Sequence, residues 1–203
     1  MKAPCNKISI SPGNQKMGYI PSVSLPPVVT CAHGCTCAKK CYAAKLCRIR
    51  ASVRNAYQRN LDILENDPAC YWLQVKAAAM VTRYFRFHVS GDIPDYNYLE
   101  NMIQLATELP GTRFLCFTKK YSLVNEYIDH TGKIPANLQL VFSAWDGMHM
   151  ENPYNLPVAN VIFKGTEPAE NWKICGGNCM ECACRGVGCW ELKPGEHIAF
   201  YEH

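Results

Sequence analysis

Hydrophobic positions recur at helical spacing in several parts of the chain. One apolar stripe, from Val53 to Leu64, predicts a helix that the Asp67-Pro68 pair stops. A second stripe, from Leu99 to Leu109, predicts a helix with Asp95 as its N-cap. Further helices are predicted at 71–80 and 121–129. Before all of them, the proline-rich segment 1–30 is expected to be irregular or extended.

Short apolar segments between these helices predict β-strands. At 84–89, three apolar residues alternate with Arg86, His88 and Ser90, which is the period-two pattern of a strand. The other predicted strands span 113–118, 138–145, 160–164 and 197–201. Strands that alternate with helices are typical of right-handed crossovers and a parallel sheet.

The polar side of the 84–89 strand bears on the architecture. A strand between two helical layers is apolar on both sides, so an inward polar side indicates a lumen that holds a site. A complete eight-stranded barrel needs about 250 residues, and this chain has 203. We therefore predict an α/β fold, an incomplete (β/α) barrel of about five or six mainly parallel strands with cysteine-rich N- and C-terminal loops.

Size and composition favour a single globular domain. The chain of 22.9 kDa is 48% hydrophobic and 19% charged, which excludes a disordered protein. We divide the domain into an N-terminal segment with the first cysteine group (1–47), a β/α core (48–165) and a C-terminal cysteine-rich segment with the last strand (166–203). Because no apolar run could span a membrane and no apolar signal core follows Met1, a cytoplasmic protein without membrane contact is expected.

Thirteen cysteines are the most unusual feature of the composition. An odd number without an export signal argues against a disulfide framework and favours metal binding. Cys70 and Cys116 stand alone in apolar surroundings and are interpreted as core residues. Two dense groups provide the candidate metal ligands, which are Cys31, Cys35, Cys37, Cys41, Cys175, Cys179, Cys182 and Cys189. Cys184 is interpreted as a spare thiol or an alternative to Cys182.

The spacing within the two groups favours iron–sulfur clusters over zinc. Zinc sites usually combine two separated pairs of ligands, whereas each group here is a run of cysteines without paired histidines. Lys39, Lys40 and Arg185 lie next to the thiols and would offset the negative charge of a cluster. Three N-terminal thiolates would leave one iron of a [4Fe–4S] cluster open to a substrate, whereas Cys35 as a fourth ligand would close it. Zinc is the alternative metal.

Polar residues at the predicted strand ends are further candidates. Ser90-Gly91-Asp92 is either a cofactor-binding turn or a tight turn in which Asp92 caps the next helix. The candidate catalytic residues are His88, as a proton donor, and Lys119, as a partner for a carboxylate or phosphate. Their alternative roles are those of an interior histidine and a solvated lysine. A basic stretch, which is either a solvated helix face or a nucleic-acid contact, comprises Arg48, Arg50, Arg54 and Arg59.

Several motifs together resemble those of a known family. In chain order they are Gly13-Asn14 with Lys16, Ser24-Leu25-Pro26, Cys31 to Cys41-Tyr42-Ala43, His88-Val89-Ser90-Gly91-Asp92, Thr118-Lys119 and Cys189-Trp190. These motifs are spread over nearly the whole chain. In their identity and order, the chain resembles the phage gene-product-88-like family. In that family Cys31, Cys37 and Cys41 match recurrent cysteines, and Cys35 matches a variable position.

The resemblance implies a partial barrel and an N-terminal cluster loop similar to those of radical S-adenosylmethionine (SAM) enzymes. The usual loop of those enzymes, Cys-x3-Cys-x2-Cys, fits no frame of this chain. From Cys31 the gaps are three residues and one residue, and from Cys37 the third position is Ala44. The resemblance therefore implies cluster binding more firmly than it implies the use of SAM.

The sequence thus predicts an iron–sulfur protein with two [4Fe–4S]-type clusters, acting as a radical-SAM-like or reductive enzyme at the N-terminal cluster. The implied partners are an electron donor and a small-molecule or macromolecular substrate, with nucleic acid as a further partner. The alternatives are a zinc-binding nucleic-acid or protein interaction module and a two-cluster electron carrier.

Overall fold

The structure, a computed structural model, describes residues 5–202 and contains one eight-stranded sheet. The strand order is β1-β2-β3-β4-β5-β6-β8-β7, and among the described residues every neighbouring pair is parallel except β1 with β2. The strands are β1 (Ile10–Ser11), β2 (Ser22–Val23), β3 (Tyr84–Phe87), β4 (Arg113–Thr118), β5 (Leu138–Ser143), β6 (Val158–Ile162), β7 (Lys173–Ile174) and β8 (His197–Tyr201).

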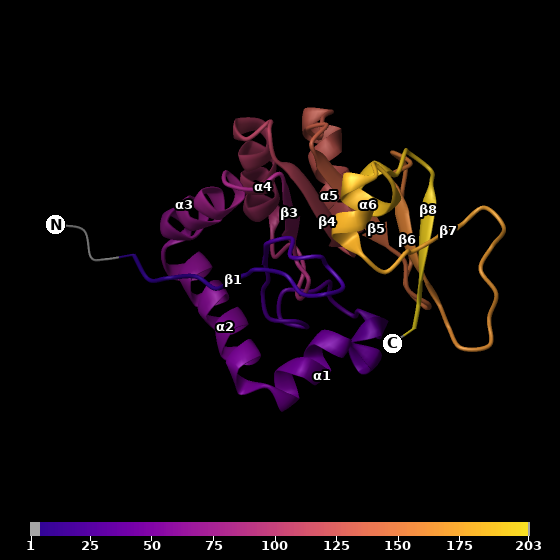
Figure 1. The fold of residues 1–203 in the computed structure, drawn as a ribbon, viewed down its shortest axis with the longest axis horizontal. Helices are drawn as coiled ribbons and strands as arrows, with labels where there is room; N and C mark the ends of the chain where they lie inside the picture. The colour runs from indigo at the N-terminus through magenta and orange to yellow at the C-terminus, as the bar shows by residue number, and fades with distance from the viewer. Residues whose placement is uncertain (1–4, 203) are drawn as a thin grey trace.

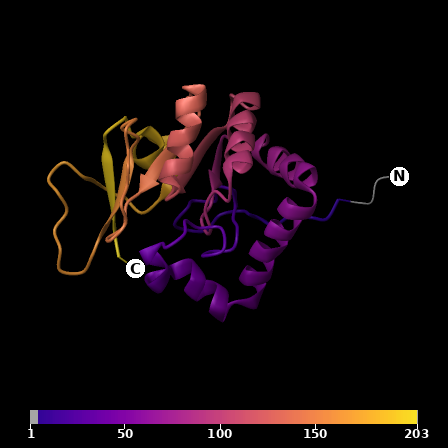
Figure 2. The same ribbon diagram turned by 180° about the vertical axis from the view of Figure 1, so that it is seen from behind.

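Helices cover the two faces of the sheet unequally (Figure 1). The helices are α1 (Tyr42–Ile49), α2 (Ala51–Asn66), α3 (Pro68–Ala79), α4 (Tyr96–Glu108), α5 (Tyr121–Thr131) and α6 (Cys179–Cys184), with short 3₁₀ helices η1 (Thr36–Lys40) and η2 (Gly188–Glu191). Figure 2 shows α4 and α5 in front of the sheet, with α1 and α2 forming an arm below it. No helix within residues 5–202 combines the length and the apolar character that crossing a bilayer requires.

Side-chain alternation along β3 and β4 creates two separate cores. Phe85 and Phe114 are fully buried under the layer formed by α3, α4 and α5. Tyr84 and Leu115 point to the opposite face, where they pack with Trp190 of η2. Burial of a large apolar side chain contributes about 1.5–3 kcal/mol, so both cores stabilise the sheet.

The α/β class and the mainly parallel sheet agree with the sequence prediction, but the strand number differs. The structure has eight strands where about five or six were expected, because β1, β2 and β7 have two residues each and leave no alternating pattern. The sheet is open, with β1 and β7 as its two edges. β5 ends at Ser143, earlier than predicted, and β6 begins at Val158, two residues before its predicted start.

β3 ends two residues earlier than predicted because the backbone turns at His88. This residue has a φ of 58°, in the left-handed region, so regular alternation stops there. The His88 ring lies 5.3 Å from the ring of Tyr98 in α4, whereas Val89 packs against the core that contains Trp190. The predicted alternation of Arg86, His88 and Ser90 along one strand face is therefore interrupted at His88.

Two aspartates set the helix boundaries. Asp67 follows α2, as predicted, and also caps α3, since its carboxylate accepts a hydrogen bond from the Cys70 amide at 3.0 Å. With Pro68 in the first turn, α3 begins earlier than the predicted position 71. Asp95 caps α4 as predicted, accepting a hydrogen bond from the Tyr98 amide at 2.8 Å.

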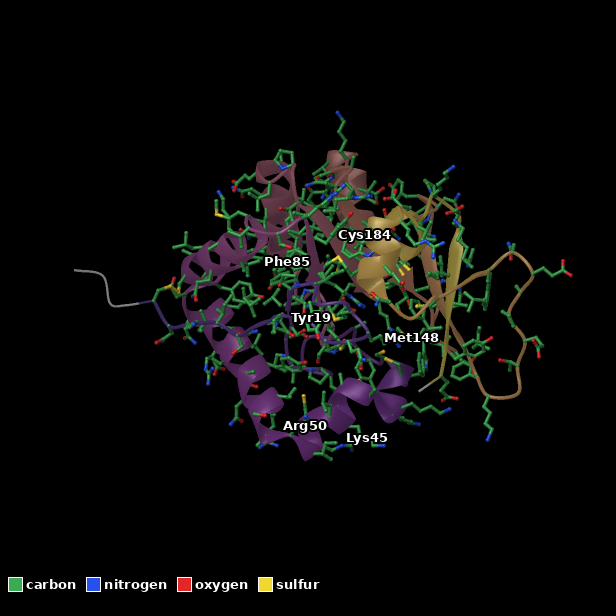
Figure 3. All side chains as sticks on the ribbon, in the orientation of Figure 1. Tyr19, Lys45, Arg50, Phe85, Met148 and Cys184 are labelled. Carbon is green, nitrogen blue, oxygen red and sulfur yellow. A yellow bond between two sulfur atoms is a disulfide. The ribbon has the colours of Figure 1, made fainter. Side chains whose placement is uncertain are left out.

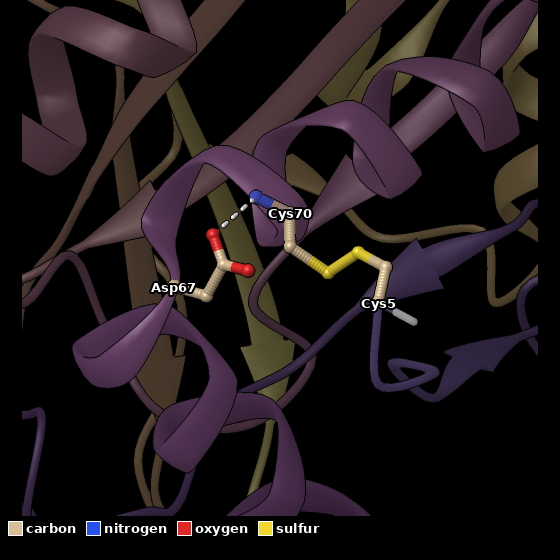
Figure 4. Close-up of side chains that lie close together, drawn as sticks. All are labelled: Cys5, Asp67 and Cys70. Atoms are coloured by element: carbon tan, nitrogen blue, oxygen red, sulfur yellow. Dashed lines mark hydrogen bonds between the residues drawn. A yellow bond between two sulfur atoms is a disulfide. The ribbon is translucent and has the colours of Figure 1, made fainter. Parts of the chain in front are cut away.

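A disulfide joins Cys5 to Cys70 at the start of α3 (Figure 4). Cys70 is buried, in agreement with its interpretation as a core residue, but its sulfur also has this covalent partner. The bond fixes the N-terminal segment to a helix 65 residues further along the chain. The other eleven cysteines are free thiols.

The C-terminal cysteine-rich segment packs over the second face of the sheet and against the N-terminal segment. The Cys179 amide donates to the Lys16 carbonyl at 3.1 Å. A Cβ at Gly18 would lie 2.4 Å from Cβ of Met180, so only glycine permits this approach. Trp190 is 1% exposed and donates its Nε1 hydrogen to the Cys179 carbonyl at 3.1 Å. The two ends of the chain therefore form one wall.

Replacing Gly91 by alanine is expected to lower the free energy of unfolding by about 2–3 kcal/mol. Gly91 has a φ of +79°, and an added Cβ would lie 2.7 Å from both the Leu25 carbonyl oxygen and Thr30 Oγ1. Urea denaturation followed by far-UV circular dichroism measures the change. The matched control is Gly111→Ala, where an added Cβ meets nothing within 4 Å. Equal unfolding free energies for the two variants would contradict the prediction.

Candidate functional site

Both cysteine groups line one cavity of about 560 Å³. The cavity lies over the sheet face that carries Arg86 and Phe117, and it reaches the strand ends at Asp92, Lys119 and Ser143. Thiols from two distant parts of the sequence are thus brought to a common space. The thiols that line it are Cys31, Cys35, Cys37, Cys41, Cys175, Cys179, Cys182 and Cys189.

The N-terminal thiols are held by a short 3₁₀ helix and the start of α1. Cys35 precedes η1, Cys37 lies within it, and Cys41 is the N-cap of α1. Cys41 Sγ accepts a hydrogen bond from the Ala44 amide at 3.4 Å, and Cys31 Sγ accepts one from the Val28 amide at 3.3 Å. All four thiols are partly exposed to the cavity, which makes each accessible to a metal.

Burial favours the protonated form of two of these thiols, Cys31 and Cys37, when no cation is bound. It raises the pKa of Cys31 to about 11 and that of Cys37 to about 12. Neighbouring thiols raise both values further, whereas the Lys119 ammonium group lowers the pKa of Cys37. Because a metal binds the thiolate, loading of this group must release protons.

The C-terminal thiols lie on α6 and in the turns that flank it. Cys179 and Cys182 are on one face of α6, three residues apart, and Cys175 and Cys189 approach from either side. Cys189 is buried, which raises its pKa to about 12, and the thiolates of Cys175 and Cys179 raise it as well. Cys184 is exposed and does not line the cavity; Figure 3 labels it on α6.

The separation of the thiols differs from that of a mononuclear site. Zinc binds thiolates at about 2.3 Å, which brings tetrahedral ligands to within about 4 Å of one another. Among residues 5–202, no three free thiols lie mutually within 4.8 Å. A cluster of several irons holds its thiolate ligands further apart than a single ion does. Within the described residues the free thiols therefore do not form a preassembled mononuclear site.

Three buried polar side chains at the cavity have atoms without a hydrogen-bond partner. They are Arg86 at Nε, His88 at both ring nitrogens and Ser90 at Oγ. Arg86 also approaches Cys179 Sγ, at 3.8 Å from Nη1, and lies over the Phe117 ring. Burial lowers the pKa of His88 to about 3, so its ring is neutral and offers one donor and one acceptor. Unsatisfied buried groups of this kind point to a bound polar molecule or ion.

Asp92 lines the cavity and does not cap the next helix. Its carboxylate accepts hydrogen bonds from Thr118 Oγ1 at 2.6 Å and from the Lys119 amide at 2.8 Å, while Asp95 caps the following helix. Asp92 therefore ties the end of β3 to the end of β4. Ser90 and Gly91 lie beside it at the cavity, where Gly91 packs against the N-terminal segment.

Lys119 is half-buried at the cavity. Its Nζ donates to Ser143 Oγ at 2.8 Å and lies 5.9 Å from the centre of the Trp145 ring. The charge of Lys119 therefore faces the cavity and the N-terminal thiols. Three other cavity residues, which sequence reasoning did not select as site residues, are Arg86, Asn14 and Tyr42. Arg86 could have been identified as a site residue from the sequence, because it is a polar residue in an apolar strand. No periodicity identifies Asn14.

Comparison with known families identifies the family of this chain. The family described as gene product 88 matches residues 6–190, which is most of the chain and includes both cysteine groups. Comparison with curated proteins and with solved structures finds no significant match to either.

Proposed function

The chain belongs to the gene product 88 family, and from the site that it builds we propose that it is an iron–sulfur protein with two [4Fe–4S]-type clusters. The first is held by Cys31, Cys37 and Cys41, with Cys35 as the variable fourth ligand. The second is held by Cys175, Cys179, Cys182 and Cys189. The proposed activity is that of a reductive or radical-SAM-like enzyme that acts at the first cluster.

One observation carries this proposal. Eight thiols from the two ends of the chain line a single cavity together with unpartnered polar atoms of Arg86, His88 and Ser90. Thiolates are the usual ligands of iron–sulfur clusters, and in the described part of the chain no three free thiols lie as close together as a preassembled mononuclear site requires. A purely structural metal site would need neither the cavity nor the unpartnered polar groups.

The wider architecture is part of the same proposal. We interpret the open parallel sheet as an incomplete barrel whose lumen is the cavity, at the strand ends where such folds bind ligands. A cytoplasmic location is proposed because a reducing compartment keeps the eleven free thiols available for metal.

The residues of the cavity have separable roles. A bound cluster supplies single electrons at a potential that net charge and hydrogen bonds to sulfur adjust. Arg86 places a positive charge beside Cys179 and stabilises the thiolate form of the second group. His88 and Ser90 orient a polar substrate group through their unpartnered atoms. Lys119, fixed by Ser143, attracts an anionic group of the substrate toward the first group.

Metal and sulfide analysis of anaerobically purified protein tests the proposal. The expected result is about eight irons with matching sulfide per chain, together with a broad visible absorbance and a paramagnetic signal after reduction. Addition of SAM to the same sample then tests whether that cofactor alters the signal. Zinc without sulfide would overturn the proposal and favour an interaction module instead.

A further inference from the structure

Charge is divided very unevenly along the chain. Residues 1–61 contain ten lysines and arginines and no aspartate or glutamate. Residues 62–203 contain eleven lysines and arginines against seventeen acidic residues, which is why the net charge of the whole chain is only +4. A mildly basic protein therefore contains one strongly basic part, which is the sequence pattern of an electrostatic binding surface.

The structure presents much of this positive charge on α1 and the first turns of α2. Lys45, Arg48 and Arg50 are exposed, and within the described residues none of them forms an ion pair with a carboxylate. Figure 3 shows Lys45 and Arg50 on the outer side of the α1–α2 arm, away from the sheet. Arg54 and Arg59 are also exposed, on α2. We call these five residues the basic arm.

The basic arm is continuous with the mouth of the cavity. The helix α1 begins at Tyr42, and Tyr42 and the preceding Lys40 and Cys41 line the cavity. Tyr42 is 52% exposed, and Tyr19, two residues beyond the cavity-lining Met17, is 74% exposed. Exposed aromatic rings beside positive charge are the elements with which proteins bind unpaired bases and their phosphates.

We propose that the basic arm binds single-stranded nucleic acid. Its cations would pair with successive phosphates, and bases would stack on Tyr42 and Tyr19 where the strand reaches the cavity. A cavity of about 560 Å³ has room for a nucleotide but not for a duplex. The arm contains none of the cavity thiols, so the binding does not depend on the proposed clusters.

The buried faces of α1 and α2 favour nucleic acid over a membrane surface. A helix that lies on a bilayer inserts its apolar face among the lipids. Here Cys47, Leu61 and Ile63 are buried within the protein, so the two helices expose no continuous apolar face, although Ile49 at the end of α1 is exposed. What the arm offers to a partner is charge, and a polyanion is the partner that fits it.

Fluorescence anisotropy with a labelled single-stranded oligonucleotide of about 20 residues, over a range of salt concentrations, tests the proposal. The variant Lys45→Gln/Arg48→Gln/Arg50→Gln removes three charges from the arm. The matched control, Lys133→Gln/Lys164→Gln/Lys193→Gln, removes three charges from exposed positions elsewhere. Metal content and far-UV circular dichroism of both variants show whether fold and metal loading are retained.

We expect the control to bind as the wild type does. The arm variant should bind roughly tenfold or more weakly, and the slope of log affinity against log salt should fall by about 2. Equal binding by the two variants overturns the proposal, as does equal affinity for a duplex or a preference for anionic phospholipid vesicles. Ultraviolet cross-linking of the wild type is an independent measurement, in which cross-links that avoid residues 42–59 also overturn it. The anisotropy and the cross-linking both report on the basic arm alone. Neither result is expected to change if the protein holds zinc or no metal, so the test is independent of the proposed clusters.

Discussion

Replacement of Cys37 by alanine is expected to remove about half of the bound iron and leave a folded protein. Cys37 lies on the cavity wall in η1, which has no buried residue, and it belongs to neither hydrophobic core. The C-terminal thiols lie on a separate segment, so their iron should be retained. Iron and sulfide analysis, with the paramagnetic signal of each cluster, measures the loss.

Two further variants complete this experiment. Cys184→Ala is the matched control, because Cys184 is exposed and outside the cavity, and it should keep the full iron content. Cys35→Ala should also keep it if the first cluster has an open iron. Loss of the cluster in Cys35→Ala would favour a closed, electron-carrying centre, and an unfolded Cys37→Ala would show that the first group is structural.

Trp190→Ala is expected to lower the free energy of unfolding by about 3–5 kcal/mol. The indole is 1% exposed, packs edge-on against Tyr84 and donates a hydrogen bond to the Cys179 carbonyl. Its removal opens a cavity in the second core and leaves that carbonyl without its partner. Urea denaturation followed by far-UV circular dichroism measures the change in unfolding free energy.

The control for Trp190 is an apolar side chain outside both cores. Leu73 is 66% exposed on α3, so Leu73→Ala should change the unfolding free energy by no more than about 0.5 kcal/mol. If Trp190→Ala costs as little as Leu73→Ala, the C-terminal segment does not contribute to the stability of the sheet. Iron analysis of Trp190→Ala would then separate a role in metal binding from one in folding.

Hydrophobic periodicity predicted the helices and strands that are long enough to show a repeating pattern of apolar and polar residues. β4 and β8 have the predicted bounds, and Asp95 caps α4 as its position before an apolar stripe indicated. The two-residue strands β1 and β2 were not predicted, because β2 forms by pairing with β3, and β1 by pairing with β2, and not from a local pattern. The early end of β3 was also not predictable from the local sequence, since nothing local requires His88 to adopt a positive φ.

The candidate site was predictable to a similar degree. Dense cysteine spacing identified both groups of thiols, and of the two positions considered, Cys182 or Cys184, it is Cys182 that lines the cavity. Spacing could not show that the two groups face one cavity, because that depends on packing of the chain ends. Spacing also could not predict the disulfide between Cys5 and Cys70, since disulfide connectivity cannot be deduced from the positions of cysteines alone.

β8 occupies an interior position in the sheet although it lies at the C-terminal side of the described residues. It lies between β6 and β7, and the Cys175 amide donates to the Ala199 carbonyl at 2.9 Å, so the segment that begins the C-terminal cysteine group is anchored to this strand. A change that displaces β8 would therefore disturb the C-terminal thiols directly, whereas η1 and the start of α1, which carry N-terminal thiols, do not pair with it.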